Sequence, residues 1–124
     1  MGLDMYANSV PAEASIDDFS FIPDEATEIA YWHKHNALHG WMHELFIAKG
    51  GTGDFNCQPI RLTEDTLKEL RTRIKNKSLT CTSGFFFGGT YEYDDRRAER
   101  DLQFVLDALT IVRSGGAVYY DSYW

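Results

Sequence analysis

The sequence predicts an α+β fold, in which a small and mainly antiparallel sheet is covered by about three helices. Two observations predict it: strand-like stretches lie at both ends of the chain, the N-terminal one alternating and the C-terminal one rich in aromatic residues, and segments between them repeat apolar residues at helical spacing. A length of 124 residues suits one compact domain. We therefore expect a single domain over residues 1–124, whose sheet is formed by the N-terminal segment, residues 84–91 and the C-terminal segment.

The first expected element is a short strand, because residues 3–7 alternate apolar and polar side chains. The acidic segment 8–24 follows and is rich in Pro, Ala, Ser and Asp, so we expect a loop. Pro23 and the two acidic residues after it suit the first turn of a helix, where a missing N–H is harmless and negative charge favours the helix dipole. The apolar side chains that should hold the loop to the body of the protein are Ile16, Phe19, Phe21 and Ile22.

A central helix is expected from Thr27 to Lys49, and it contains all four histidines of the chain. At about 100° per residue, one arc of this helix is apolar. The residues of that arc are Tyr31, Leu38, Met42, Leu45 and Phe46, and the residues inside it or along its edge are His35, His39, Trp32, Asn36 and His43. Buried polar groups need hydrogen-bond partners. Two interpretations stay open: these histidines are satisfied core or rim residues, or they face a ligand pocket.

A second helix is expected after an extended segment at residues 59–62. Thr63 suits its N-cap, acidic residues follow in its first turn, and apolar residues recur at positions 67, 70 and 74. Its outer face is strongly basic and carries Lys68, Arg71, Arg73, Lys75 and Lys77. Such cations could neutralise phosphates, but a charge run is more often a solvated face, and we prefer that interpretation.

The last third of the chain contains a glycine-bracketed phenylalanine run and a third helix. Residues 84–91 predict a buried strand or a tight loop, and they lack the pattern of a phosphate-binding loop. Apolar residues at helical spacing predict the third helix from near Asp94 to Val112, and Gly115 and Gly116 end it. The aromatic segment 117–124 should form the last strand.

The net charge of −7 is concentrated near the N-terminus. Residues 1–28 hold seven acidic residues and no Lys or Arg, whereas the rest holds 12 acidic and 12 basic residues and is neutral. This acidic stretch of residues 1–28 could dock on basic partner surfaces, but solvation of a loop is the simpler role.

No apolar run approaches the roughly 20 residues that cross a membrane. No secretory signal precedes Cys57 and Cys81, so we expect a cytoplasmic protein with reduced thiols.

The spacing of the histidines also has to be weighed as a metal site. His35, His39 and His43 follow one another at intervals of one helical turn, and two such His can share a Zn²⁺ ion. No Glu completes a His-Glu-x-x-His motif, so we expect no metal and no cofactor; if a metal binds, these three histidines are the first candidates. Cys81 or Ser83 could act as a nucleophile beside a histidine, but no local signature supports it, which favours a non-catalytic protein.

Four blocks of the sequence combine polar and aromatic residues: Met-Gly-Leu-Asp-Met-Tyr at the start, Tyr31-Trp32-x-Lys34-x-Asn36-Ala37-x-His39-x-Trp41, Ser83-Gly-Phe-Phe-Phe-Gly-x-Thr90 with Tyr91 and Tyr93, and Tyr119-Tyr120-x-Ser122-x-Trp124. In this order they resemble a family of small, uncharacterised bacteriophage proteins, some of which carry the name phosphoglycerate kinase. The chain departs from the family at His33, where the family has Arg, and in its acidic segment. A chain of 124 residues without a phosphate-binding loop cannot house that two-domain kinase. The resemblance implies a phage origin and an accessory role, such as disarming a host system.

The function that the sequence favours is sequestration of a small polar or nucleotide-like ligand, and the resemblance implies that this would counter a host defence system in the infected cell. Stacking rings, an ammonium, an imidazole and an amide suit such a ligand. The expected ligand-binding residues are Trp32, Lys34, Asn36, His39, Tyr91 and Tyr93. Two alternatives stay open: an inhibitor of a host protein that uses exposed aromatics and the acidic N-terminal segment, and a small enzyme with His39 as general base. We expect no direct binding to nucleic acid or membrane, and the sequence leaves a homo-oligomer open.

Overall fold

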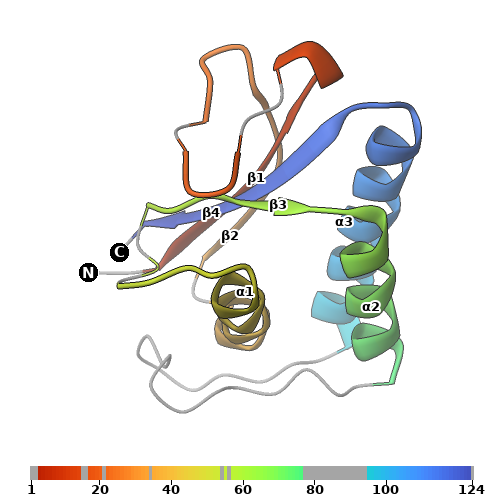
Figure 1. Ribbon diagram of the computed structural model, residues 1–124. Coiled ribbons are helices and arrows are strands. Elements are labelled where there is room, and N and C mark those ends of the chain that lie inside the picture. The colour runs from red at the N-terminus through yellow and green to blue at the C-terminus, as the bar shows by residue number, and fades with distance from the viewer. Residues whose placement is uncertain are drawn as a thin grey trace.

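A four-stranded antiparallel sheet forms the centre of the structure, a computed structural model that describes residues 3–14, 17–20, 22–33, 35–53, 55, 57–76 and 95–123 (Figure 1). The strands lie in the order β2-β1-β4-β3, and each neighbouring pair is antiparallel. The elements are β1 (Asp4–Val10), the short 3₁₀ helix η1 (Ala12–Ala14), β2 (Thr27–His33), α1 (Asn36–Ala48), β3 (Ile60–Leu62), α2 (Glu64–Lys75), α3 (Asp95–Arg113) and β4 (Ala117–Tyr123). The predicted α+β class is confirmed.

One face of the sheet packs against α1, α2 and α3 and holds the main core. Strand residues that contribute to this core include Met5, Ala7, Trp32, Val118 and Tyr120. The helices contribute Leu38, Met42 and Phe46 from α1, Leu67, Leu70 and Ile74 from α2, and Phe104, Val105 and Leu109 from α3. A smaller cluster, in which Ile22 and Ala26 pack against Val10, Ala117 and Tyr119, lies on the second face. The N-terminal segment therefore covers one end of that second face.

The predicted helix from Thr27 to Lys49 is wrong over its first third, because residues 27–33 form the strand β2. This strand pairs with β1 along its length, and Trp32 lies opposite Met5. Trp32 is buried whereas the residue on either side of it is exposed, which is the alternation of a strand. α1 begins only at Asn36. The apolar spacing fitted a helix locally, but pairing with β1 determines the conformation.

The acidic segment 8–24 also departs from its predicted loop. β1 runs on to Val10, and η1 follows it. The helical turn expected at Pro23 is wrong, because the chain makes a turn there in which the Ala26 N–H donates to the Pro23 carbonyl oxygen at 3.0 Å. This turn leads the chain directly into β2.

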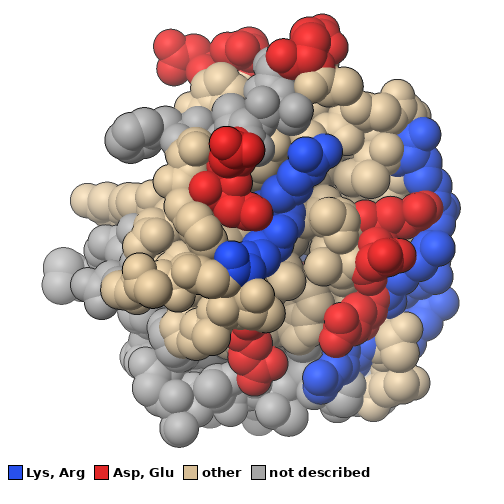
Figure 2. Space-filling view, viewed as in Figure 1, with Lys and Arg blue, Asp and Glu red and all other residues tan. Residues whose placement is uncertain are grey.

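Polar as well as apolar groups hold the N-terminal segment in place. Phe19 meets the Phe46 ring edge-on, with 5.4 Å between ring centroids. The Asp18 carboxylate accepts a hydrogen bond from the Arg61 backbone N–H at 2.6 Å and pairs with the Lys49 ammonium at 3.3 Å. The predicted anchors Ile16 and Phe21 lie outside the described residues. Figure 2 shows acidic side chains at the top of the molecule, where Figure 1 places the N-terminal segment, and basic ones along the flank of the helices.

The rest of the chain follows the prediction wherever it is described. Thr63 caps α2, and its hydroxyl oxygen accepts from the Thr66 N–H at 3.3 Å. α3 begins at Asp95 and is followed by Gly115, which has a φ of +98°. The strand expected at residues 84–91 lies outside the described residues. None of the described helices combines the length and the apolar character needed to cross a bilayer.

Candidate functional site

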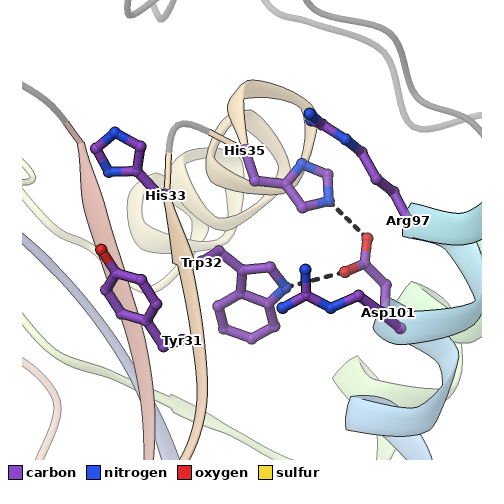
Figure 3. A pocket seen from close by; sticks show the side chains of 7 residues that line it. Tyr31, Trp32, His33, His35, Arg97 and Asp101 are labelled. Atoms are coloured by element: carbon purple, nitrogen blue, oxygen red, sulfur yellow. Dashed lines mark hydrogen bonds and ion pairs between the residues drawn. The ribbon is translucent and has the colours of Figure 1, made fainter.

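A buried carboxylate joins three separate elements beside β2. Asp101 lies on α3 and is only 1% exposed. One of its oxygens accepts a hydrogen bond from the Trp32 indole N–H on β2 at 2.9 Å, and the other lies 2.6 Å from Nε2 of His35, which precedes α1 (Figure 3). A buried carboxylate needs hydrogen-bond donors around it. Since such charge-assisted bonds are short and strong, they fix the positions of Trp32 and His35 relative to Asp101.

The second nitrogen of His35 defines the state of its ring. Nδ1 accepts a hydrogen bond from the Leu38 backbone N–H at 3.4 Å, so His35 acts as the N-cap of α1, a position usually taken by Ser, Thr, Asn or Asp. A nitrogen that accepts carries no proton. The pattern therefore assigns the proton of a neutral imidazole to Nε2, which donates to Asp101.

A half-open pocket of about 240 Å³ lies against this hydrogen-bonded network. Its lining residues are Tyr31, Trp32, His33, His35, Arg97, Arg100 and Asp101. Arg97 and Arg100 are three residues apart on α3, so both can present their guanidinium groups to the same side of the helix. Figure 3 shows Arg97 and His35 on the same side of the pocket, opposite Tyr31 and His33. Two guanidinium groups and two imidazoles make the lining rich in donors.

The pocket continues along the groove between β2 and α3. A neighbouring hollow of about 250 Å³ shares Tyr31, Trp32 and Arg100 with it and extends as far as Asp107. Each hollow alone is smaller than the roughly 300–1,000 Å³ of a drug-sized ligand site. Together they offer room for a small charged group at one end and an extension along β2 at the other.

A second carboxylate orients two side chains at the mouth of the pocket. One oxygen of Asp4 accepts a hydrogen bond from the Tyr31 hydroxyl at 2.6 Å and lies 3.1 Å from Nδ1 of His33. These hydrogen bonds, first that of Tyr31 and then that of His33, lower the pKa of Asp4. The same bond to Asp4 raises the pKa of Tyr31 to about 12, so its phenol stays neutral. If Nδ1 of His33 donates to Asp4, its Nε2 becomes the acceptor nitrogen.

The predicted site residues fall in different places. Trp32 lines the pocket, but His39 lies in the core on α1 and is fully buried. Its Nδ1 lies 2.7 Å from the Tyr120 hydroxyl, and its ring stacks on Phe55 with 5.2 Å between centroids. Burial lowers the pKa of His39 to about 3, and this ring does not line the pocket beside β2. Lys34, Tyr91, Tyr93 and the side chain of Asn36 lie outside the described residues.

The side chains from α3 are the residues that sequence reasoning missed. Arg97, Arg100 and Asp101 belong to a helix that was considered only for its apolar spacing. One signal was available, because Asp101 stands three residues after Ala98 and four before Val105, on the apolar stripe itself. A carboxylate on a buried stripe needs partners from elsewhere in the fold.

The three histidines named as metal candidates have separate environments. His35 bonds to Asp101, His39 approaches Tyr120, and the His43 ring lies against Phe46 and Phe55. Burial lowers the pKa of His43 as it does that of His39. Among the described residues, no three His, Cys, Asp or Glu side chains are grouped so that they could hold a metal ion. Cys81, the second thiol of the chain, lies outside them.

The fold and the pocket define a small α+β protein with a donor-rich hollow beside the edge of its sheet. Comparison with known proteins adds no relative, since no protein-family model, no curated protein and no solved structure matches the chain. The chemistry of the pocket is therefore the basis for assigning a function.

Proposed function

We propose that the protein binds and sequesters a small anionic, nucleotide-like ligand in the pocket between β2 and α3. One observation carries this proposal: Arg97 and Arg100 stand at a hollow whose floor contains Trp32 and His35, both held by Asp101. A guanidinium group binds phosphate or carboxylate through two parallel hydrogen bonds, which makes a pair of Arg a strong anion site.

The charge of Asp101 does not outweigh this positive character, because the pocket lining holds two guanidinium groups and one carboxylate. The oxygens of Asp101 accept hydrogen bonds from Trp32 and His35, which hold the carboxylate against the floor of the pocket. Arg97 and Arg100 are exposed, so their guanidinium groups are within reach of a ligand. In a protein with a net charge of −7, such a local cation pair attracts an anion to this place.

The aromatic side of the pocket supports a ligand that has a ring. Tyr31 is 41% exposed and is oriented by its bond to Asp4. A nucleobase stacked on an aromatic side chain contributes roughly 1–3 kcal/mol to binding. A ligand with a phosphate group near the two Arg and a base near Tyr31 would use both kinds of contact.

Sequestration is favoured over turnover because the buried polar groups already have structural roles. His35 caps α1 and bonds to Asp101, and His39 is enclosed in the core. If the protein were an enzyme, His33, oriented by Asp4, would be the residue best placed to act as general base. Taken together with the resemblance to phage proteins, capture of a ligand without turnover suits an accessory protein that removes a nucleotide-like signal molecule of the host.

Calorimetric titration with mononucleotides, cyclic dinucleotides and inorganic phosphate tests the proposal. We expect Arg100→Ala to weaken binding about tenfold or more, because it removes a charge-assisted hydrogen bond. Arg96→Ala is the matched control, since Arg96 is an exposed neighbour on α3 that does not line the pocket. Equal loss in both variants would mean that only the net charge matters.

Phosphorus NMR of the bound ligand separates sequestration from catalysis. We expect the ligand to be recovered unchanged after a long incubation with the protein. Conversion that stops in a His33→Ala variant would instead establish an enzyme.

A further inference from the structure

The face of the sheet opposite the helices carries a second polar and aromatic surface. Six side chains from three adjacent strands form it: Asp4 and Tyr6 of β1, Tyr31 and His33 of β2, and Asp121 and Tyr123 of β4. We call this surface the tyrosine face. The N-terminal segment covers the other end of the same sheet face, where Tyr119 is buried. The described helices α1, α2 and α3 lie on the opposite side of the sheet (Figure 1).

The strand register arranges these side chains in two rows. In one row Asp4 stands between His33 and Tyr123, and in the next row Tyr6 stands between Tyr31 and Asp121. Each carboxylate therefore has tyrosine neighbours across the strands or diagonally. The rings of Tyr6 and Tyr31 are in contact, with 5.3 Å between centroids. Tyr31 and Tyr123 are 41% and 61% exposed, so parts of both side chains are accessible to a partner.

The charges of the tyrosine face select one kind of partner. It carries two carboxylates and no Lys or Arg, and the pKa values of Tyr6 and Tyr31 are raised, Tyr6 mainly by burial and Tyr31 mainly by its hydrogen bond to Asp4. An anionic partner such as a nucleic acid would be repelled. A cation is attracted by carboxylates and by the faces of tyrosine rings.

We propose that the tyrosine face binds an arginine-bearing basic segment of another protein. A planar guanidinium group can stack on a tyrosine ring while it donates two hydrogen bonds to a carboxylate, which a Lys ammonium cannot do. The rows of Tyr and Asp place rings and carboxylates at neighbouring positions of the sheet. One oxygen of Asp4 bonds to Tyr31 and His33 and one oxygen of Asp121 accepts from the Ser122 N–H, and the second oxygen of each carboxylate is the one offered to a guanidinium group. The acidic N-terminal quarter of the chain adds long-range attraction for the same partner.

This proposal does not depend on the pocket between β2 and α3. Tyr31 and His33 belong to both surfaces, but Tyr6, Asp121 and Tyr123 do not line the pocket. Variants of Asp121 and Tyr123 therefore test the tyrosine face while they leave the anion site unchanged. If these variants lose peptide binding but bind nucleotide normally, the result supports the tyrosine face as a peptide site and leaves the proposed anion pocket unaffected.

Titration of isotope-labelled full-length protein with two nine-residue peptides, one alternating Arg with Gly and one alternating Lys with Gly, tests the proposal by NMR. We expect shifted resonances in β1, β2 and β4, and roughly threefold to tenfold tighter binding of the arginine peptide. Tyr123→Ala and Asp121→Asn should each weaken binding of the arginine peptide by a similar factor. Tyr123 is exposed at a strand end, so its removal should leave the fold intact even if Asp121→Asn does not.

The matched control is Asp24→Asn, which makes the same charge change in the exposed N-terminal segment. We expect it to change binding less than about twofold, because a single exposed charge is screened by salt. The proposal is overturned if Asp24→Asn weakens binding as much as Asp121→Asn, or if the shifts spread over residues 11–26. It is also overturned if both peptides bind equally or if neither binds.

Discussion

At the scale of single residues, Asp101 is the side chain on which the site depends most. It accepts hydrogen bonds from two elements that are 66 and 69 residues away in sequence. Its removal would take the acceptor from both the Trp32 indole and the His35 imidazole. We expect Asp101→Ala to lower the free energy of unfolding by roughly 3 kcal/mol, because hydrogen bonds to a buried charge contribute about 1.5–3 kcal/mol each.

Urea denaturation of this variant checks the prediction. Asp107→Ala is the control, since Asp107 lies six residues further along α3, is exposed, and accepts a hydrogen bond from the Gln103 side chain at 3.0 Å. It should change stability by no more than about 0.5 kcal/mol. If Asp101→Ala is equally mild, the carboxylate does not hold the site together.

His39 was correctly placed beside the apolar arc of its helix but wrongly assigned to a ligand pocket, because it is buried in the core. The sequence predicts a polar group beside an apolar arc, and the structure encloses that group between Tyr120 and Phe55. Burial leaves the folded imidazole neutral down to a pKa of about 3, whereas the unfolded imidazole takes up a proton below pH 6.5. The unfolded state therefore binds more protons between these values, and stability decreases as the pH is lowered across that window.

The expected loss from His39 is about 2 kcal/mol between pH 7 and pH 5. It can be measured by comparing the pH dependence of urea denaturation in the wild type and in His39→Gln. Glutamine keeps an acceptor for the Tyr120 hydroxyl but does not titrate in this range. A curve of unchanged slope in the variant would show that another group controls the pH dependence.

At the scale of elements, the sequence predicted those whose signals are local. α2 begins at a capping Thr63 and buries the apolar residues that its spacing indicates. α3 and β4 are likewise close to their expected bounds. β2 was missed because its residues fit a helical arc, and only the partner strand β1 makes the extended form favourable. A short strand that gains its stability from a distant segment carries little information in its own sequence.

The end of α3 offers a prediction about an element boundary. Gly115 has a φ of +98°, and its N–H donates to the Val112 carbonyl oxygen at 3.1 Å. Apart from its two chain neighbours, no atom of the described residues stands within 4 Å of the place where a Cβ would lie, so the backbone conformation is what opposes a side chain there. We expect Gly115→Ala to destabilise the protein by roughly 1–2 kcal/mol. Gly115→Asn should cost less, because Asn tolerates the left-handed region better, and equal melting temperatures for the two variants would contradict this account.

At the scale of the whole molecule, the candidate site is where sequence reasoning was least complete. Trp32 was named as a ligand residue and His35 only as a metal candidate, whereas both Arg residues and Asp101 come from a helix far along the chain. Their convergence depends on how α3 packs across the sheet, which no short motif encodes. The fold class was predictable from periodicity, but the pocket is a product of tertiary packing.

The way in which the acidic N-terminal segment, residues 11–26, is held to the body also belongs to this scale. Asp18 bonds to the Arg61 N–H and pairs with Lys49, and the Phe19 N–H donates to the Pro59 carbonyl oxygen at 2.7 Å. These contacts join the segment to the β3 region and α1, and Phe19, which is 37% exposed, reaches the main core only at the edge of the Phe46 ring. We therefore expect the segment to open independently of the sheet.

Hydrogen exchange of an Asp18→Ala variant tests this independence. Amide exchange should accelerate about tenfold at Phe19 and Arg61, since the loss of one charge-assisted bond removes roughly 1.5 kcal/mol from the local opening energy. The amides of β1 and β4 that pair with each other should keep their wild-type rates. Asp17→Ala, at the exposed neighbouring position, is the control for the loss of charge alone. If the β1 and β4 amides accelerate by the same factor as Phe19, the segment and the sheet unfold as one unit, and the acidic segment is part of the global fold.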